Sequence, residues 1–153
     1  MYDYFIAELH CPRCGTVNLT TSYTNMQTHL RSDADGSALA VGYEFDPADL
    51  TTSHILDAGY ALISAPTEGK PIRLLEVWIC PVCKTEQWAM IEIVSRRIER
   101  IEAVSMSRAI LESANFISEV NSELLAVSLM GISWAEFSER KLSSVAVLRQ
   151  RLE

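Results

Sequence analysis

The sequence contains little glycine, little proline and no long apolar run. Of its 153 residues, six are glycine and five are proline, which excludes collagen-like and low-complexity chains. The uncharged stretch at residues 124–135 has twelve residues, whereas a helix that crosses a bilayer needs about 20. Residues 1–6 carry an acid where a secretory signal needs bases. We therefore expect a soluble, cytoplasmic protein that does not enter the membrane.

Sequence signatures of common enzymes are missing as well. The chain has no glycine-rich phosphate loop, no H-E-x-x-H pattern and no G-x-S-x-G nucleophile turn. It has only three histidines. His10 is interpreted as the end of a strand, while a catalytic role stays open for His29 and His54. Because lone histidines are more often structural or exposed than catalytic, we predict that the protein is not an enzyme.

Four cysteines form two matched pairs, Cys11-Pro-Arg-Cys14 and Cys80-Pro-Val-Cys83. In a secreted protein they could form two disulfides, and a single C-x-x-C could be a redox dithiol. Two matched pairs without a secretory signal favour a metal site, because zinc prefers four soft ligands in a tetrahedron. Gly15 follows the first pair at a position that suits a positive φ. Lys84 holds the equivalent position, so the second turn is expected to be less regular.

With strand-like residues on both sides of each pair, residues 2–21 and 72–94 resemble a zinc ribbon. The resemblance implies Cys11, Cys14, Cys80 and Cys83 as the ligands of one structural zinc ion. The 65 residues between the pairs exceed the spacing of a minimal ribbon. Rubredoxin-like iron binding is also compatible with the two pairs, although the chain has no helical Glu-x-x-His pair for a second iron centre. Zinc ribbons bind nucleic acid, bind proteins or are purely structural, so the motif does not decide the function.

Positive charge is missing from one part of the chain. The chain has 13 Lys and Arg against 20 Asp and Glu, a net charge of −7. Residues 96–153 are balanced, so the whole excess lies in residues 1–95. Residues 32–69, which we call the acidic span, contain no Lys or Arg. They contain seven carboxylates: Asp33, Asp35, Glu44, Asp46, Asp49, Asp57 and Glu68.

The acidic span has two interpretations. It is either a solvated surface that keeps the protein soluble or an interface for a basic partner. A surface of one sign speeds association with an oppositely charged protein. The ends of the span are also anchored at the two cysteine pairs, and loops on a rigid base commonly carry binding residues. We assign partner binding to Asp33, Asp35, Glu44, Asp46, Asp49 and Asp57.

Patterning changes from β-prone to helical along the chain. Strands are predicted at residues 2–9, 16–23, 38–45, 72–79 and 86–94, with a short helical turn at 47–50. Residues 86–94 lack polar alternation, so both faces of that strand are expected to be buried.

Helices are predicted at residues 107–120, then from a cap at Asn121 to Met130, and then from a capping box at Ser133, with Trp134 in the core. The fold class is therefore α+β. A β-rich, zinc-ribbon-like module at residues 1–95, with a long acidic insertion at 24–71, carries a helical segment at 96–153 that packs on it.

A second resemblance concerns function. Residues 2–15, the later Asn25-Met-Gln-Thr and the second cysteine pair are similar to small immunity proteins that accompany bacterial polymorphic toxins of the Rhs type. The resemblance covers mainly the regions of the two pairs. It implies a protein that neutralises a cognate toxin domain by binding and occluding it. If the toxin acts on an anionic substrate such as RNA, DNA or NAD, an acidic inhibitor would mimic that charge.

The alternative is a nucleic-acid-associated zinc ribbon of transcription or translation. That function needs a basic path with stacking aromatic residues. The closest group of basic residues is Arg96, Arg97 and Arg100, and it interleaves with Glu99 and Glu102. The sequence therefore favours a basic protein partner over nucleic acid, and it leaves the oligomeric state open.

Overall fold

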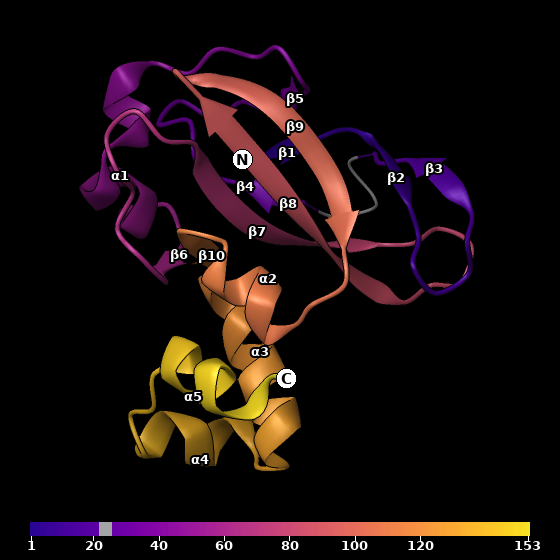
Figure 1. The fold of residues 1–153 in the computed structure, drawn as a ribbon, viewed down its shortest axis with the longest axis vertical. Coiled ribbons are helices and arrows are strands. Elements are labelled where there is room, and N and C mark those ends of the chain that lie inside the picture. Colours follow the sequence, from indigo (N-terminus) through magenta and orange to yellow (C-terminus); the bar gives the residue numbers. More distant parts are fainter. Residues whose placement is uncertain (22–25) are drawn as a thin grey trace.

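The computed structural model describes residues 1–21 and 26–153, and its centre is a five-stranded sheet (Figure 1). The strand order is β6-β10-β7-β8-β9. Two long strands, β7 (Ile72–Ile79) and β8 (Glu86–Val94), have the bounds that the sequence predicts. β9 (Arg97–Val104) continues the antiparallel meander. On the other side, β10 (Phe116–Ser118) runs parallel to β7 and antiparallel to the outer strand β6 (Tyr60–Leu62).

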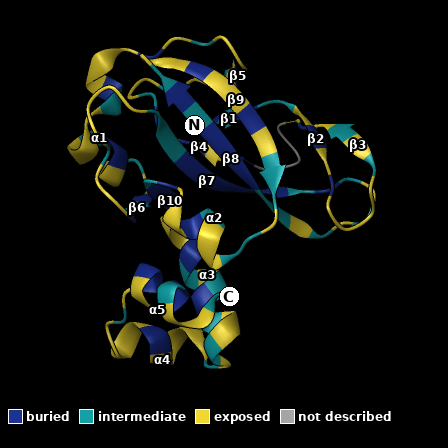
Figure 2. Cartoon of the chain, viewed as in Figure 1, coloured by how far each residue is buried: buried dark blue, intermediate teal, exposed yellow. Residues whose placement is uncertain are grey.

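The two long strands are buried on both faces of the sheet. Side chains alternate across a strand, so Leu74 and Trp78 of β7 face one core while Leu75 faces the other. In β8 the consecutive residues Ala89, Met90 and Ile91 are all buried, as expected from the missing polar alternation (Figure 2). The sheet therefore separates two hydrophobic cores.

The N-terminal third of the chain covers the first face. β1 (Asp3–Phe5) pairs with β4 (Gln27–Thr28) and β5 (Ala38–Leu39) in a small sheet, and β2 (Glu8–His10) pairs with β3 (Val17–Leu19). A 3-10 helix, η1 (Pro47–Leu50), and α1 (Thr52–Asp57) follow, so the predicted helical turn at 47–50 is confirmed. Apolar side chains such as Phe5, Leu39 and Phe45 pack in one core with Trp78.

Two predicted strands are shorter than the sequence indicates. Residues 2–9 form two strands, β1 and β2, that belong to different sheets. Of residues 38–45, only the first two form β5, because the chain turns at Gly42, whose φ is +98°. Of the predicted strand at 16–23, Val17–Leu19 form β3, and the strand ends before Thr20. Ser22 and Tyr23 lie outside the described residues, as does Asn25.

Four helices cover the second face, below the sheet in Figure 1. They are α2 (Arg108–Glu112), α3 (Glu119–Met130), α4 (Trp134–Glu139) and α5 (Ser144–Arg151). Their apolar side chains pack with those of the sheet in the second core. The Ser133 side chain accepts the Glu136 N–H, and Gly131 ends α3 with a φ of 65°, as the capping and glycine signals predict. The α+β fold class, with N-terminal strands and C-terminal helices, is confirmed.

The start of the predicted helical segment is wrong. Residues 97–104 form β9, and the predicted helix at 107–120 ends at Glu112 because Phe116–Ser118 enters the sheet as β10. Asn115 makes this change of direction: its side-chain Oδ1 accepts the Arg73 N–H at 2.8 Å, and its amide donates to the Ser64 carbonyl at 3.2 Å. The predicted cap at Asn121 is also wrong, since Asn121 lies inside α3. The helical periodicity of a sequence carries no information about such long-range hydrogen bonds.

Trp134 is not the core residue that the apolar stripe predicts. Its exposed fraction is 43%, whereas that of Phe137, one helical turn later, is 4%. The two rings lie 6.3 Å apart between centroids. Phe137 therefore carries the contact of α4 with the core, and Trp134 covers its outer side.

We expect Phe137→Ala to cost about 3–5 kcal/mol of the free energy of unfolding, because it removes a buried aromatic ring. Trp134→Ala should cost about 1 kcal/mol or less, since much of that ring stays in water. Urea denaturation of both variants measures the difference. Equal shifts of the two midpoints would contradict the packing of α4.

A buried carboxyl lies in the central strand. Glu76 of β7 has an exposed fraction of 4% and accepts a hydrogen bond from the Tyr60 hydroxyl. The Thr28 hydroxyl lies 2.8 Å from the same Tyr60 oxygen. Burial raises the pKa of Glu76 to about 8 from an ordinary 4.5. The folded protein therefore holds a proton here that the unfolded chain releases.

This proton makes stability fall as pH rises. Between about pH 4.5 and 8 the folded state binds more protons than the unfolded state, so Glu76 lowers the free energy of unfolding by up to about 1.4 kcal/mol per pH unit. Glu76→Gln, which stays neutral, should remove that slope and stabilise the protein most at pH 8. Urea denaturation from pH 5 to 8 checks this, with the exposed Glu99→Gln as a control that keeps the slope.

Candidate metal centre

The first cysteine pair lies in a tight turn between β2 and β3. The Cys11 N–H donates to the Thr16 carbonyl at 2.9 Å, and the Gly15 N–H donates to the Cys11 carbonyl at 2.9 Å. Gly15 has a φ of 75°, the left-handed region that glycine enters without steric cost. The turn therefore directs both thiols of the pair to one side.

The second pair lies in a matching turn between β7 and β8. The Cys80 N–H donates to the Thr85 carbonyl at 3.0 Å, and the Lys84 N–H donates to the Cys80 carbonyl at 2.9 Å. Lys84 has a φ of 60°. The expectation of a less regular second turn is wrong, because lysine takes here the same left-handed conformation as Gly15.

The two turns bring all four thiols together. All four sulfurs lie within 4.8 Å of one another. Two contacts join the two turns, with Cys11 Sγ 3.7 Å from Cys83 Sγ and Cys14 Sγ 3.6 Å from Cys80 Sγ. A disulfide needs about 2.05 Å, whereas a metal with four sulfurs at about 2.3 Å spaces them about 3.8 Å apart in a tetrahedron. The four cysteines can therefore hold one metal ion, and the spacing is compatible with structural zinc.

In both turns a threonine hydroxyl contacts a thiol and in turn accepts a side-chain amide, so the two turns have matching hydrogen bonds around their cysteines. The Thr16 hydroxyl lies 3.0 Å from Cys14 Sγ and accepts the Asn18 amide at 2.8 Å. Because the amide takes a lone pair of the hydroxyl oxygen, the hydroxyl proton is free to donate to the sulfur. In the second turn the same roles fall to residues that were not predicted from the sequence: Thr85, 2.9 Å from Cys83 Sγ, and Gln87, which donates to Thr85 at 2.9 Å.

These outer partners could have been found in the sequence. Residues 11–18 and 80–87 share the pattern C-P-x-C-x-T-x-[N/Q]. Hydrogen bonds to metal-bound thiolates orient the ligands and tune their affinity. The repeat therefore extends the candidate site from four to eight residues.

Hydrogen bonds lower the pKa of two of the thiols, whereas burial raises the pKa of a third. The Cys83 backbone N–H lowers the pKa of Cys80 to about 6, and the Thr16 hydroxyl lowers the pKa of Cys14. Burial raises the pKa of Cys11 to about 11. A divalent cation would favour the thiolate form of every ligand.

Three acidic residues of the N-terminal region share Arg31. Its guanidinium donates to the fully buried carboxylate of Asp3 at 2.9 and 3.0 Å. Burial alone would raise the pKa of Asp3, but Arg31 and two backbone N–H groups hold it below its ordinary value. Asp35 pairs with Arg31 and accepts the Ser37 hydroxyl. Asp33 lies 3.8 Å from Arg31, and 86% of its side chain is exposed.

The other carboxylates assigned to partner binding have separate positions. Glu44 pairs with Arg96 at 2.7 Å, and Asp46 accepts the Ala48 N–H at the start of η1. Asp49 is buried, with an exposed fraction of 6%, so it is not available to a partner. Asp57 is exposed at the end of α1 and has no hydrogen bond or ion pair with any described residue. Much of the acidic span therefore holds the fold together.

Two of the histidines make structural contacts with residues far away in the sequence. His54 Nε2 lies 2.6 Å from the Leu30 carbonyl, to which it donates, and 3.6 Å from the Asp49 carboxylate. The ring of His29 lies 4.2 Å from that of Tyr2. His10 is exposed at the end of β2.

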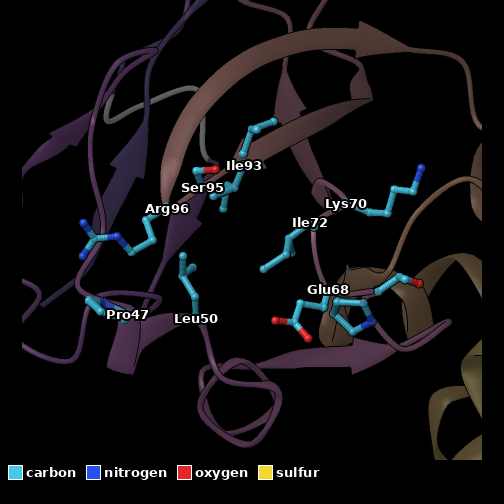
Figure 3. Close-up of a pocket in the computed structure, with 12 residues that line it drawn as sticks. Pro47, Leu50, Glu68, Lys70, Ile72, Ile93, Ser95 and Arg96 are labelled. Carbon is cyan, nitrogen blue, oxygen red and sulfur yellow. The ribbon is translucent and has the colours of Figure 1, made fainter.

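A cavity of about 450 Å³ lies at the end of β7 and β8 opposite the thiols, between η1, the loop at 66–71 and the β8–β9 turn (Figure 3). Leu50, Ile72 and Ile93 line its apolar part. Lys70 and Arg96 lie at its rim, and Arg96 already pairs with Glu44. Its lining contains no histidine or cysteine.

Comparison with known proteins yields no relative. No protein-family model matches the chain, and neither a curated protein nor a solved structure matches it. Among the described residues, no helix combines the length and the apolar character that crossing a membrane requires. The function of this chain is therefore inferred from its own geometry.

We expect Cys80→Ser to lose the bound metal and to lower the melting temperature, because an ion held by the four thiols would link two turns that 65 residues separate. Elemental analysis for zinc and iron, with thermal unfolding, measures both effects. Val82→Ser changes an exposed residue of the same turn and should keep the metal. Wild-type protein without metal and with four freely reactive thiols would contradict the site.

Proposed function

We propose that the ion is zinc and that its role is structural. The support is the ligand set: four cysteines fill a tetrahedral shell and leave no open position for water or substrate, as a catalytic zinc requires. The four sulfurs come from two turns that contact each other, so the ion would fasten the β2–β3 hairpin to the β7–β8 hairpin. An iron-loaded protein in the elemental analysis would favour the rubredoxin-like alternative.

We further propose that the protein is an antitoxin-like immunity protein, which binds a basic toxin domain and occludes its active site. The observation that carries this proposal is the surplus of negative charge that the fold leaves unpaired. Asp33 is 86% exposed and shares the single cation Arg31 with Asp3 and Asp35. Asp57 and Glu68 are exposed without an ion pair to any described residue. Such a surface attracts a cationic protein and speeds association with it.

The structure of the acidic span restricts which residues serve the partner. Asp49 is buried and Asp46 caps η1, so their replacement would disturb the fold as well as any interface. Among the six carboxylates assigned to partner binding, Asp33 and Asp57 are those whose replacement changes charge at the least structural cost. They are therefore the residues to test.

The function is tested with the tagged, metal-loaded protein in its native cell. We expect it to retain a basic protein that is toxic when expressed alone and harmless when the two are expressed together. A retained protein whose toxicity is unchanged, or stable retention of RNA or DNA instead, would contradict the immunity function.

The role of charge is tested with the same pair. Asp33→Lys combined with Asp57→Lys should slow association several-fold at low salt and reduce its salt dependence. The reason is that a less negative surface attracts a basic partner less strongly before contact. Glu139→Lys, at an exposed position of α4, has the same sign of charge change outside the span and serves as the control. Equal association rates for all three proteins would make the acidic span a solubility surface only.

A further inference from the structure

The two outer strands of the central sheet differ in how their edges are protected. β9 has exposed charged residues, Arg97, Glu99, Arg100 and Glu102, and its start is covered by residues 42–45, with the Ile98 N–H donating to the Tyr43 carbonyl at 2.9 Å. Charged side chains and covering loops are common means by which proteins keep sheet edges from pairing with other chains. β6, with the sequence Tyr-Ala-Leu, has neither charge nor proline.

The register of β6 shows which of its backbone groups face outward. Glu119 N–H donates to the Gly59 carbonyl at 3.0 Å, and Ile63 N–H donates to the Asn115 carbonyl at 2.7 Å. In an antiparallel pair the residues that bond to the neighbour alternate with residues that face away. The backbone groups of Tyr60 and Leu62 therefore point away from β10, and no strand of the described residues pairs with that side.

A hollow of about 390 Å³ borders this open edge. Its lining includes all three residues of β6, Leu56 of α1, and the start of α5. Leu56 and Leu62 are exposed to 39% and 40%, so their apolar side chains are accessible beside the open backbone edge. The hollow thus offers apolar contacts and unpaired backbone groups at one place.

The charged residues that line the hollow are both acids. Glu119 and Glu123 occupy positions i and i+4 of α3, where side chains are neighbours. Burial and the neighbouring Glu119 carboxylate raise the pKa of Glu123. The pair is unfavourable in the free protein, and a cation between the two carboxylates would relieve the repulsion. Among the basic residues, Lys141 is nearest in the sequence to the lining of the hollow: it directly precedes Leu142, and it is exposed.

We propose that an extended segment of a protein partner, with lysine or arginine alternating with apolar residues, adds to the outer edge of β6 as a further strand. Its backbone would pair with Tyr60 and Leu62, its apolar side chains would contact Leu56 and Leu62, and its cations would reach Glu119 and Glu123. Strand addition of this kind takes affinity from main-chain hydrogen bonds and specificity from the side-chain pockets. The inference rests on the proposed function for the basic charge of the partner, and it places the contact at β6, near the end of the acidic span, and at the start of α3.

The probe is a synthetic eight-residue peptide of alternating lysine and valine, added to isotope-labelled, metal-loaded protein. We expect amide chemical-shift changes in NMR spectra that concentrate at residues 60–62 and 119–123. A peptide of alternating glutamate and valine should give at least ten-fold weaker binding. Shift changes concentrated at Asp33, Asp35 and Glu44 instead, or equal binding of the two peptides, would overturn the proposal.

Two variants separate the backbone and the charge contributions. Leu62→Pro removes an N–H that faces outward and leaves the bonds to β10 intact, so binding of the lysine peptide should be lost while the metal content stays. Glu119→Gln combined with Glu123→Gln should weaken binding at least five-fold, with Glu139→Gln as the control, and this test holds even if the proline variant fails to fold. Unchanged affinity in the double variant would overturn the proposal.

These outcomes differ from those of the proposed function. If wild type and the Glu119→Gln, Glu123→Gln variant neutralise a native partner equally well, the immunity function stands and the binding edge at β6 is contradicted. If the native cell contains no basic partner but the lysine peptide still binds at β6, the immunity function is contradicted and the edge stands as a binding surface.

Discussion

The pairing of β7 with β8 is the interaction on which the rest of the structure depends. The two strands pair in register from Ile72 and Ile93 to Ile79 and Glu86, and the turn between them holds Cys80 and Cys83. One face of this hairpin contributes Trp78 to the first core and the other contributes Leu75 to the second. The N-terminal layers, the C-terminal helices and the candidate metal site therefore all attach to one hairpin.

A hairpin buried on both faces constrains polar groups as much as apolar ones. Glu76 lies in its middle and is tolerated because the Tyr60 hydroxyl donates to it and because its carboxyl can stay protonated. The same logic holds for Asp3, whose charge is compensated by Arg31 and by backbone N–H groups. Several acids of this protein thus serve the fold, and only part of its net charge of −7 is available to a partner.

The candidate metal site and the proposed binding edge lie at different parts of the sheet. The β7–β8 turn and the β2–β3 hairpin, whose thiols gather at one place, lie at the right of Figure 1, whereas β6 lies at the outer edge of the sheet beside α1. A structural ion at one end would stiffen the long strands that carry β10 and, through it, β6. This arrangement separates the groups that stabilise the protein from those that we propose contact its partner.

Local signals in the sequence were enough to predict the parts of this protein that depend on neighbours in the chain. Matched C-x-x-C pairs, the apolar run of β8, the Ser133 cap and the turn at Gly131 are such signals, and the structure agrees with each. The shared threonine and amide positions of the two turns were also visible in the sequence. Local patterns suffice there because hydrogen bonds within a few residues decide the conformation.

Features that depend on distant contacts became visible only in the folded chain. Residues 116–118 have helical periodicity but form β10, because Asn115 bonds to Arg73 and Ser64 and the strand fills the gap between β6 and β7. The exposure of Trp134, the burial of Asp49 and the partners of Asp35 and Glu44 follow from the same kind of contact. Charge counted along a chain says how many acids there are, whereas their partners depend on which segments the fold brings side by side.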